Sequence, residues 1–139
     1  MLIAEIMQYL DACELVTYDA NDTSGDVFIE LPATPDTCVA VLPQPGTQSP
    51  GYDNLDNTGV QIIVRGAADT DVETQARAQA IYDKTHGFRN GWFINGGAYI
   101  LSCLSPNGGI VPLGDDDNSR PEFAVNLNIK YRNTNREVR

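Results

Sequence analysis

Apolar and polar residues alternate most regularly near the end of the chain. One face of this segment carries Phe123, Val125, Leu127, Ile129 and Tyr131, and the positions between them include Asn126, Asn128, Lys130 and Arg132. A period of two residues predicts a half-buried β-strand that turns its apolar face to the core. Shorter apolar runs predict four further strands, at 26–31, 38–42, 60–65 and 98–104.

The first residues of the chain follow a helical period instead. Leu2, Ile3, Ile6, Met7 and Leu10 recur at the spacing that gathers side chains on one side of a helix. The segment is therefore predicted to be an amphipathic helix. Its apolar stripe is expected to pack on the sheet, and presentation to a partner is the alternative.

The segment from 69 to 87 predicts a second helix. Thr70 and Glu73 have capping-box spacing, so each side chain can accept a hydrogen bond from a backbone N–H group at the helix start. Gly87 suits the left-handed position that ends many helices. The face expected to lie on the sheet carries small or branched residues: Val72, Ala76 and Ala80.

The order of these elements is a helix, three strands, a helix and two strands. This order predicts an α+β fold: a mixed, mostly antiparallel sheet of about five strands, with the N-terminal helix and the central helix packed on one face. Residues 1–133 are expected to form a single domain, and 134–139 a flexible C-terminal tail. Two long polar stretches, 43–59 and 105–120, are predicted loops and candidate partner contacts.

Charge narrows the classes of function. The chain of 139 residues has 19 acidic and 9 basic side chains and a formal net charge of -10. Nucleic acids and anionic membranes attract basic surfaces, so neither is an expected docking partner. No apolar run approaches the roughly 20 residues of a membrane span. The cysteines, Cys13, Cys38 and Cys103, lack metal-binding spacing and are expected to be reduced in an intracellular setting.

Asp115, Asp116 and Asp117 raise three possibilities: a metal site, a turn or a charged surface. A calcium loop of the EF-hand type needs glycine at its sixth position and glutamate at its twelfth. Counted from Asp115, these positions hold Arg120 and Asn126. A solvated turn is therefore the preferred interpretation, and a weak cation site is the remaining alternative. No cofactor or metal is expected.

Other catalytic arrangements find little support. His86 is the one histidine, so any serine or cysteine nucleophile would have to use it, and its position predicts a capping cation at a helix end. Asn90-Gly91 and Gly96-Gly97 are predicted turns. Trp92 lies between them, and the sequence leaves open whether it is a core residue or an exposed anchor.

The order of four segments resembles the minor capsid and tail terminator (tail completion) proteins of long-tailed bacteriophages. The segments are "DVFIELPATPDTCVAVLPQPG", "VQIIVRG", "DVETQARAQAIYDKTHG" and "PLGDDDNSRPEFAVNLNIKYR", and the resemblance extends over residues 1 to 133. It implies a structural virion protein that is not an enzyme. Such a protein is made in the host bacterial cytoplasm and ends in the tail or neck of the virion.

The resemblance further implies a homo-oligomeric ring, usually a hexamer, on the head-proximal end of the tail tube. The ring stops polymerisation of the tube protein and docks on the head-tail connector, while double-stranded DNA only passes through its channel. An acidic wall suits this passage, because like charges keep DNA from adhering. The candidate interface or channel residues are Tyr52, Asp53, Asp56, Trp92, Asp115, Asp116, Asp117 and Arg120.

Two other functions remain open at this point. A head-tail stopper or adaptor of the neck would share the size and the acidic surface, and would bind the head connector directly. A metal-dependent hydrolase would use Asp115, Asp116 and Asp117 together with His86, although this ligand set is incomplete.

Overall fold

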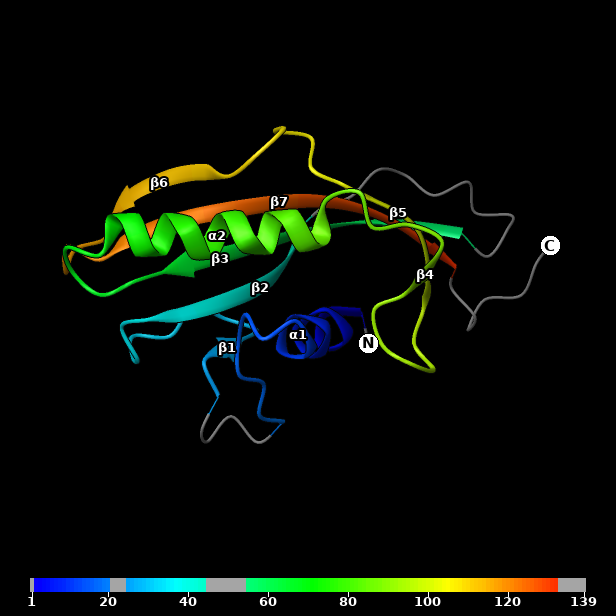
Figure 1. Cartoon of the computed structure of the whole chain (residues 1–139), viewed down its shortest axis with the longest axis horizontal. Coiled ribbons are helices and arrows are strands. Elements are labelled where there is room, and N and C mark those ends of the chain that lie inside the picture. Colours follow the sequence, from blue (N-terminus) through cyan, green and yellow to red (C-terminus); the bar gives the residue numbers. More distant parts are fainter. Residues whose placement is uncertain (1, 21–24, 45–54, 133–139) are drawn as a thin grey trace.

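A computed structural model describes residues 2–20, 25–44 and 55–132 of the chain. This part forms two helices and a curled seven-stranded sheet (Figure 1). The elements are α1 (Leu2–Ala12), β1 (Val27–Phe28), β2 (Cys38–Gln44), β3 (Leu55–Arg65), α2 (Asp71–Thr85), β4 (Gly91–Trp92), β5 (Tyr99–Leu104), β6 (Val111–Asp115) and β7 (Pro121–Arg132). The predicted α+β class is confirmed, and the sheet has more strands than the expected five.

β7 is the strand around which the sheet is arranged. The strand order is β1-β2-β3-β7-β5-β4, and β6 also pairs with β7. β3 pairs with β7 along its whole length, from Leu55 opposite Arg132 to Arg65 opposite Glu122. The other edge of β7 is shared, because β6 pairs with its first half and β5 with its second. All these pairs are antiparallel, and β1 joins β2 in parallel.

Both helices cover the same face of the sheet, as predicted. The residues of β2, β3 and β7 that point to this face form the core with Ile6 and Leu10 of α1 and Ala78 and Ile81 of α2. The buried sheet residues are Val39, Val41, Val60, Ile62, Val64, Val125, Leu127 and Ile129. Burial of one such side chain contributes about 1.5–3 kcal/mol, so this face supplies the main driving force for folding.

α1 is also linked to the far end of α2 and to the β4–β5 hairpin. The Tyr9 hydroxyl donates to the backbone carbonyl of Lys84 at 2.8 Å. The Tyr9 ring packs against Phe88 and Phe93 at centroid distances of 5.3 and 5.0 Å. Burial, with a smaller contribution from Cys13, raises the pKa of Tyr9 to about 12, which keeps this hydroxyl protonated as a donor.

The predicted sheet-facing side of α2 is wrong. Val72 is 77% exposed and Ala76 is exposed, whereas Thr74, Ala78, Ile81 and Thr85 are buried. The buried set keeps the helical period but is shifted by two residues. The physical reason is Ile81, the largest aliphatic side chain in the second half of the helix, which turns the helix so that this side enters the core.

The predicted capping box of α2 does not form. Thr70 stands at the N-cap with no side-chain hydrogen bond to the helix start. Its hydroxyl lies 2.6 Å from the Ala67 carbonyl, to which it donates, and 3.2 Å from the Thr74 hydroxyl. The preceding turn therefore uses the group that a capping box requires. At the other end, Gly87 has a φ of 85°, which confirms the predicted left-handed conformation.

The strand predicted at 26–31 is shorter than expected. Val27 and Phe28 alone pair with β2, and Ile29 is 51% exposed. Pro32 follows closely and cannot donate a ladder hydrogen bond, so the chain leaves the sheet before it. The strands at 38–42, 60–65 and 98–104 are confirmed as parts of β2, β3 and β5.

Both predicted loops contain strand residues. β2 continues through Gln44, and β3 begins at Leu55, so the stretch 43–59 is partly sheet, and 45–54 lies outside the described residues. β6 forms inside the stretch 105–120. Pro43, Pro112 and Gly114 favoured loops by propensity, yet long-range pairing with β3 and β7 overrides this local preference.

All three cysteines are free, as predicted, and Cys38 and Cys103 are buried. Burial raises the pKa of Cys103 to about 12 and also raises that of Cys38. Among the described residues, neither helix has the length and apolar character that a membrane crossing requires.

Gly66 provides a test of how closely α2 approaches the sheet. A Cβ atom at this position would meet the Thr74 and Thr70 hydroxyls at distances that no real contact allows. We therefore expect Gly66→Ala to lower the free energy of unfolding by about 1–3 kcal/mol in urea denaturation, as overpacking does. The matched control is Gly109→Ala, where a Cβ meets nothing within 4 Å. Equal stabilities of the two variants would contradict this packing.

Candidate assembly surfaces

Asp116 organises the turn between β6 and β7. One carboxylate oxygen accepts hydrogen bonds from the backbone N–H groups of Asn118 and Arg120, both at 2.9 Å. The other oxygen lies 2.7 Å from Nε of Arg120. Asp115 and Asp117 flank it with exposed side chains. The three aspartates therefore have two roles, because the middle one builds the turn and the outer two carry surface charge.

The Arg120 side chain is buried and points into its own subunit. Its guanidinium donates to the Ala33 carbonyl at 2.7 Å and to the Asp36 carboxylate at 3.1 Å. Arg65, on the neighbouring β3, donates to the carbonyls of Asp36 at 3.0 Å and Pro35 at 2.7 Å. Two arginines thus fix the segment between β1 and β2 to the end of the sheet.

These contacts shift the pKa values of the ionisable side chains in and beside the turn. Burial alone would raise the pKa of Asp116, but hydrogen bonds from the Arg120 and Asn118 backbones and from the Arg120 guanidinium outweigh it and hold the pKa below its ordinary value. The carboxylates raise the pKa of Arg120 against the opposing effect of its own desolvation. Glu122 responds in the other direction, because burial, followed by the nearby Asp116 charge, raises its pKa.

The structure does not bring together the residues of the alternative hydrolase. His86 lies at the end of α2, whereas the aspartates lie beside the start of β7, at the opposite end of the sheet (Figure 1). In the part of the chain that is described, no group of three or more histidine, cysteine or acidic side chains could hold a metal ion.

His86 is the C-cap residue of α2, as its position predicted, and its ring makes further contacts. Its Nδ1 accepts a hydrogen bond from the Ser105 backbone N–H at 2.9 Å, and its ring stacks on Tyr82. The histidine therefore connects α2 to the segment after β5.

Trp92 is exposed, which decides the question that the sequence left open. Its side chain is 55% exposed, while the following Phe93 is only 5% exposed. Trp92 packs edge-on against Tyr99, with the ring centroids 5.0 Å apart, and the Arg132 guanidinium lies 5.2 Å from the Tyr99 ring centroid. Tyr99 was not predicted as a site residue, because this cluster exists only through the pairing of β5 with β4 and β7.

Three more residues were predicted to lie at an interface or in the channel. Asp56 lies in β3 opposite Tyr131 and is partly buried. Tyr52 and Asp53 lie outside the described residues.

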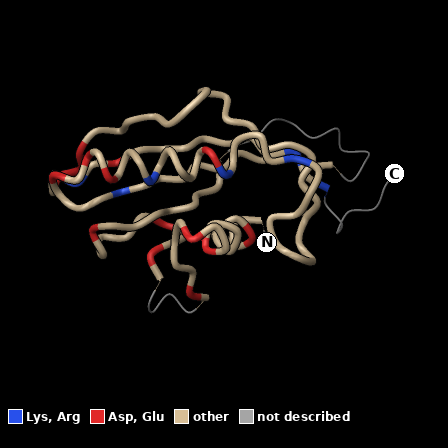
Figure 2. Tube along the Cα trace, in the orientation of Figure 1, with Lys and Arg blue, Asp and Glu red and all other residues tan. Residues whose placement is uncertain are grey.

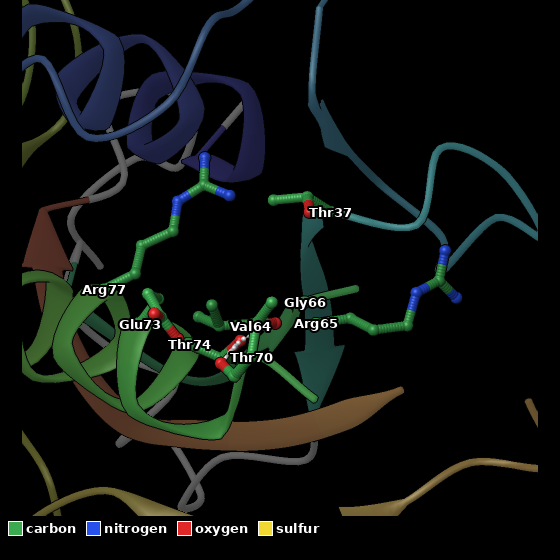
Figure 3. Close-up of a pocket in the computed structure, with 8 residues that line it drawn as sticks. All are labelled: Thr37, Val64, Arg65, Gly66, Thr70, Glu73, Thr74 and Arg77. Carbon is green, nitrogen blue, oxygen red and sulfur yellow. Dashed lines mark hydrogen bonds between the residues drawn. The ribbon is translucent and has the colours of Figure 1, made fainter. Parts of the chain in front are cut away.

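A small cavity lies between the end of β3 and the start of α2 (Figure 3). Its volume is about 190 Å³, and Gly66, Thr70 and Thr74 are among its lining residues. The Arg65 side chain extends away from the other lining residues, and the Arg77 side chain extends toward α1 (Figure 3). Arg77 instead donates to the Leu15 carbonyl at 3.0 and 3.1 Å and forms a 2.7 Å ion pair with Asp26. Both arginines beside the cavity are therefore engaged in contacts that stabilise the fold.

The edges of the sheet resist the addition of further strands. β1 and β4 each contain two residues, and β6 contains Pro112 and a bulge before Gly114. Short edge strands, proline and bulges all hinder pairing with another chain.

Uncharged amides dominate the helix-free face near the middle of β7, where the Asn126 side-chain amide donates a hydrogen bond to the Asn107 side-chain oxygen at 2.8 Å.

A family model described as "Bacteriophage tail terminator protein" matches residues 9–133. The chain belongs to the bacteriophage tail terminator family. It is therefore a structural protein of the virion tail or neck and assembles with other virion components. The expected family membership is confirmed.

The fold is similar to that of a protein in a solved virion. The chain is 18% identical to one chain of a structure titled "Virion of native gene transfer agent (GTA) particle", with a TM-score of 0.55 and coverage of 94% of each chain. A search of curated proteins finds no match. The similarity therefore extends over most of the length of both chains.

Asp116 provides a test of the β6–β7 turn. We expect Asp116→Asn to lower the urea midpoint at pH 7, because the neutral amide loses its ion pair with Arg120. A depressed folded-state pKa contributes stability that is complete above the unfolded value of about 3.9 and is lost as the pH falls through the folded value. The deficit of the variant should therefore shrink below about pH 4. Asp117→Asn, at an exposed position, is the control, and an equal deficit in both variants would contradict the assignment.

Proposed function

We propose that this protein is the terminator ring of a phage tail. Copies of the chain close into a ring, a hexamer as the family resemblance implies, on the head-proximal end of the tail tube. The ring stops addition of the tube protein and presents its other side to the head-tail connector or stopper. The family match over residues 9–133 carries this proposal.

The arrangement of the sheet supports a role in stopping growth. A protein that ends a polymer must bind the last layer without providing an edge on which further strands can pair. The two-residue edge strands and the proline-containing β6 disfavour such pairing where they lie. Assembly then uses side-chain surfaces, whose contacts can be specific for one partner.

The charge of the chain supports passage of DNA through the ring. A net charge of -10 gives a field that repels the phosphate backbone, so that DNA slides without adhering. Residues 1–133 act as one assembly unit in this proposal, and the protein needs no cofactor and catalyses no reaction.

The experiment is polymerisation of the purified tube protein with and without this protein, imaged by negative-stain electron microscopy. We expect shorter tubes with added density at one end, and light scattering of the free protein to show whether rings exist before docking. Binding to the connector with no effect on tubes would indicate a stopper instead, and binding to neither would refute the proposal.

A further inference from the structure

The two ends of the molecule carry opposite charge (Figure 2). Exposed carboxylates gather where α2 and β7 begin, and we call this surface the acidic pole: Asp69, Asp71, Glu73, Asp115 and Asp117. Exposed cations gather where β7 ends, and we call this surface the basic pole: Arg89, Lys130 and Arg132, together with Trp92 and Tyr99.

The arginines near the acidic pole do little to neutralise its surface. Arg65 is 2% exposed and Arg120 is 8% exposed, and both donate to groups of the segment between β1 and β2. Arg120 also pairs with Asp116, which is why that carboxylate is left out of the pole. The five outward carboxylates keep their charge available to a partner.

The basic pole combines charge with an aromatic surface. Arg132 lies over Tyr99, and Tyr99 contacts Trp92, which is 55% exposed. Tryptophan, tyrosine and arginine are the residue types that contribute most at protein interfaces. The carboxylates of Asp56 and Glu5 also belong to this end: Asp56 is partly buried opposite Tyr131, and Glu5 is buried and accepts a hydrogen bond from the Ala98 backbone N–H. This pole therefore suits an acidic protein surface.

The two poles of one chain are too distant to neutralise each other. The twelve residues of β7 separate them by roughly 35–40 Å at the usual strand rise. Salt screens exposed charges over about 8–10 Å, so the poles of a single subunit hardly interact. They can meet only between copies.

We propose that the basic pole of one copy docks on the acidic pole of the next. This inference rests on the proposed ring and names the surfaces that close it. A ring of more than two copies needs two different, complementary surfaces on every subunit, because one repeated head-to-tail contact generates it. The acidic and basic poles are such a pair, and charge complementarity selects this contact over the like-charge alternatives.

Complementary charge reversal tests the contact. One variant, Arg89→Glu with Arg132→Glu, makes both poles acidic. A second variant, Glu73→Lys with Asp115→Lys and Asp117→Lys, leaves two carboxylates and three lysines at the acidic pole, so both poles are basic. Each variant alone should require a roughly 100-fold or higher concentration to form rings, measured by native mass spectrometry and light scattering. An equimolar mixture should restore rings of alternating variants, because each reversed pole then meets an opposite charge.

The control changes the same charge away from the poles. Glu30→Lys with Asp83→Lys and Asp11→Lys alters exposed carboxylates and shifts the net charge as the second variant does. It should form rings as the wild type does, and circular dichroism should show that all variants are folded. Trp92→Ala should weaken ring formation without a loss of stability, because its side chain is largely exposed.

The outcomes separate this contact from the proposed function. Where the wild type forms rings only on tube ends, tube capping is the readout for every variant. If the wild type caps tubes and either reversal variant still caps them alone, the pole contact is wrong and the terminator function stands. If the mixture restores only dimers, the ring contact is also wrong. Failure of the wild type to cap tubes refutes the terminator function itself.

Discussion

The pairing of β3 with β7 is the constraint on which the other features depend. These strands match over eleven residue pairs, from Leu55–Arg132 to Arg65–Glu122. Because side chains alternate along a strand, this register alone decides that Val60, Ile62 and Val64 enter the core. A slip by one residue would turn the apolar face to solvent and the amide-rich face to the helices.

The length of the β3–β7 pair also determines which chemical groups lie at the two ends of the subunit. β6 and β5 share the second edge of β7, so its two ends receive different neighbours. At one end, Arg120 and Asp116 tie the β6–β7 turn to the segment between β1 and β2. At the other end, Arg132 covers Tyr99. One long strand therefore gives the subunit two chemically different ends, while short edge strands and proline prevent uncontrolled pairing along its sides.

The sequence predicted the features that depend on local period. The alternation of β7, the apolar stripe of α1 and the left-handed Gly87 are all confirmed, because each follows from residues close together in the chain. The side of α2 and the capping box were wrong. Both depend on how the helix sits on the sheet, which Ile81 and the turn at Ala67 determine.

The candidate surfaces likewise depend on contacts between residues distant in the sequence, which a local pattern does not predict. The aspartate turn was interpreted correctly from its composition, but the different role of Asp116 depends on its hydrogen bonds with Arg120. The exposure of Trp92 and its contact with Tyr99 follow from pairing between β4 and β5. The separation of charge into two poles likewise needs the tertiary fold. Asp69 precedes α2 and Asp117, 48 positions later, precedes β7, and these two elements begin at the same end of the molecule.

The most direct test of this account is an electron cryomicroscopy map of the capped tube end, at a resolution that places individual strands. The account predicts a closed ring in which the end of β7 in each copy faces the start of α2 in the next. A ring that joins like ends, or copies stacked along the tube axis with no ring around it, would contradict it.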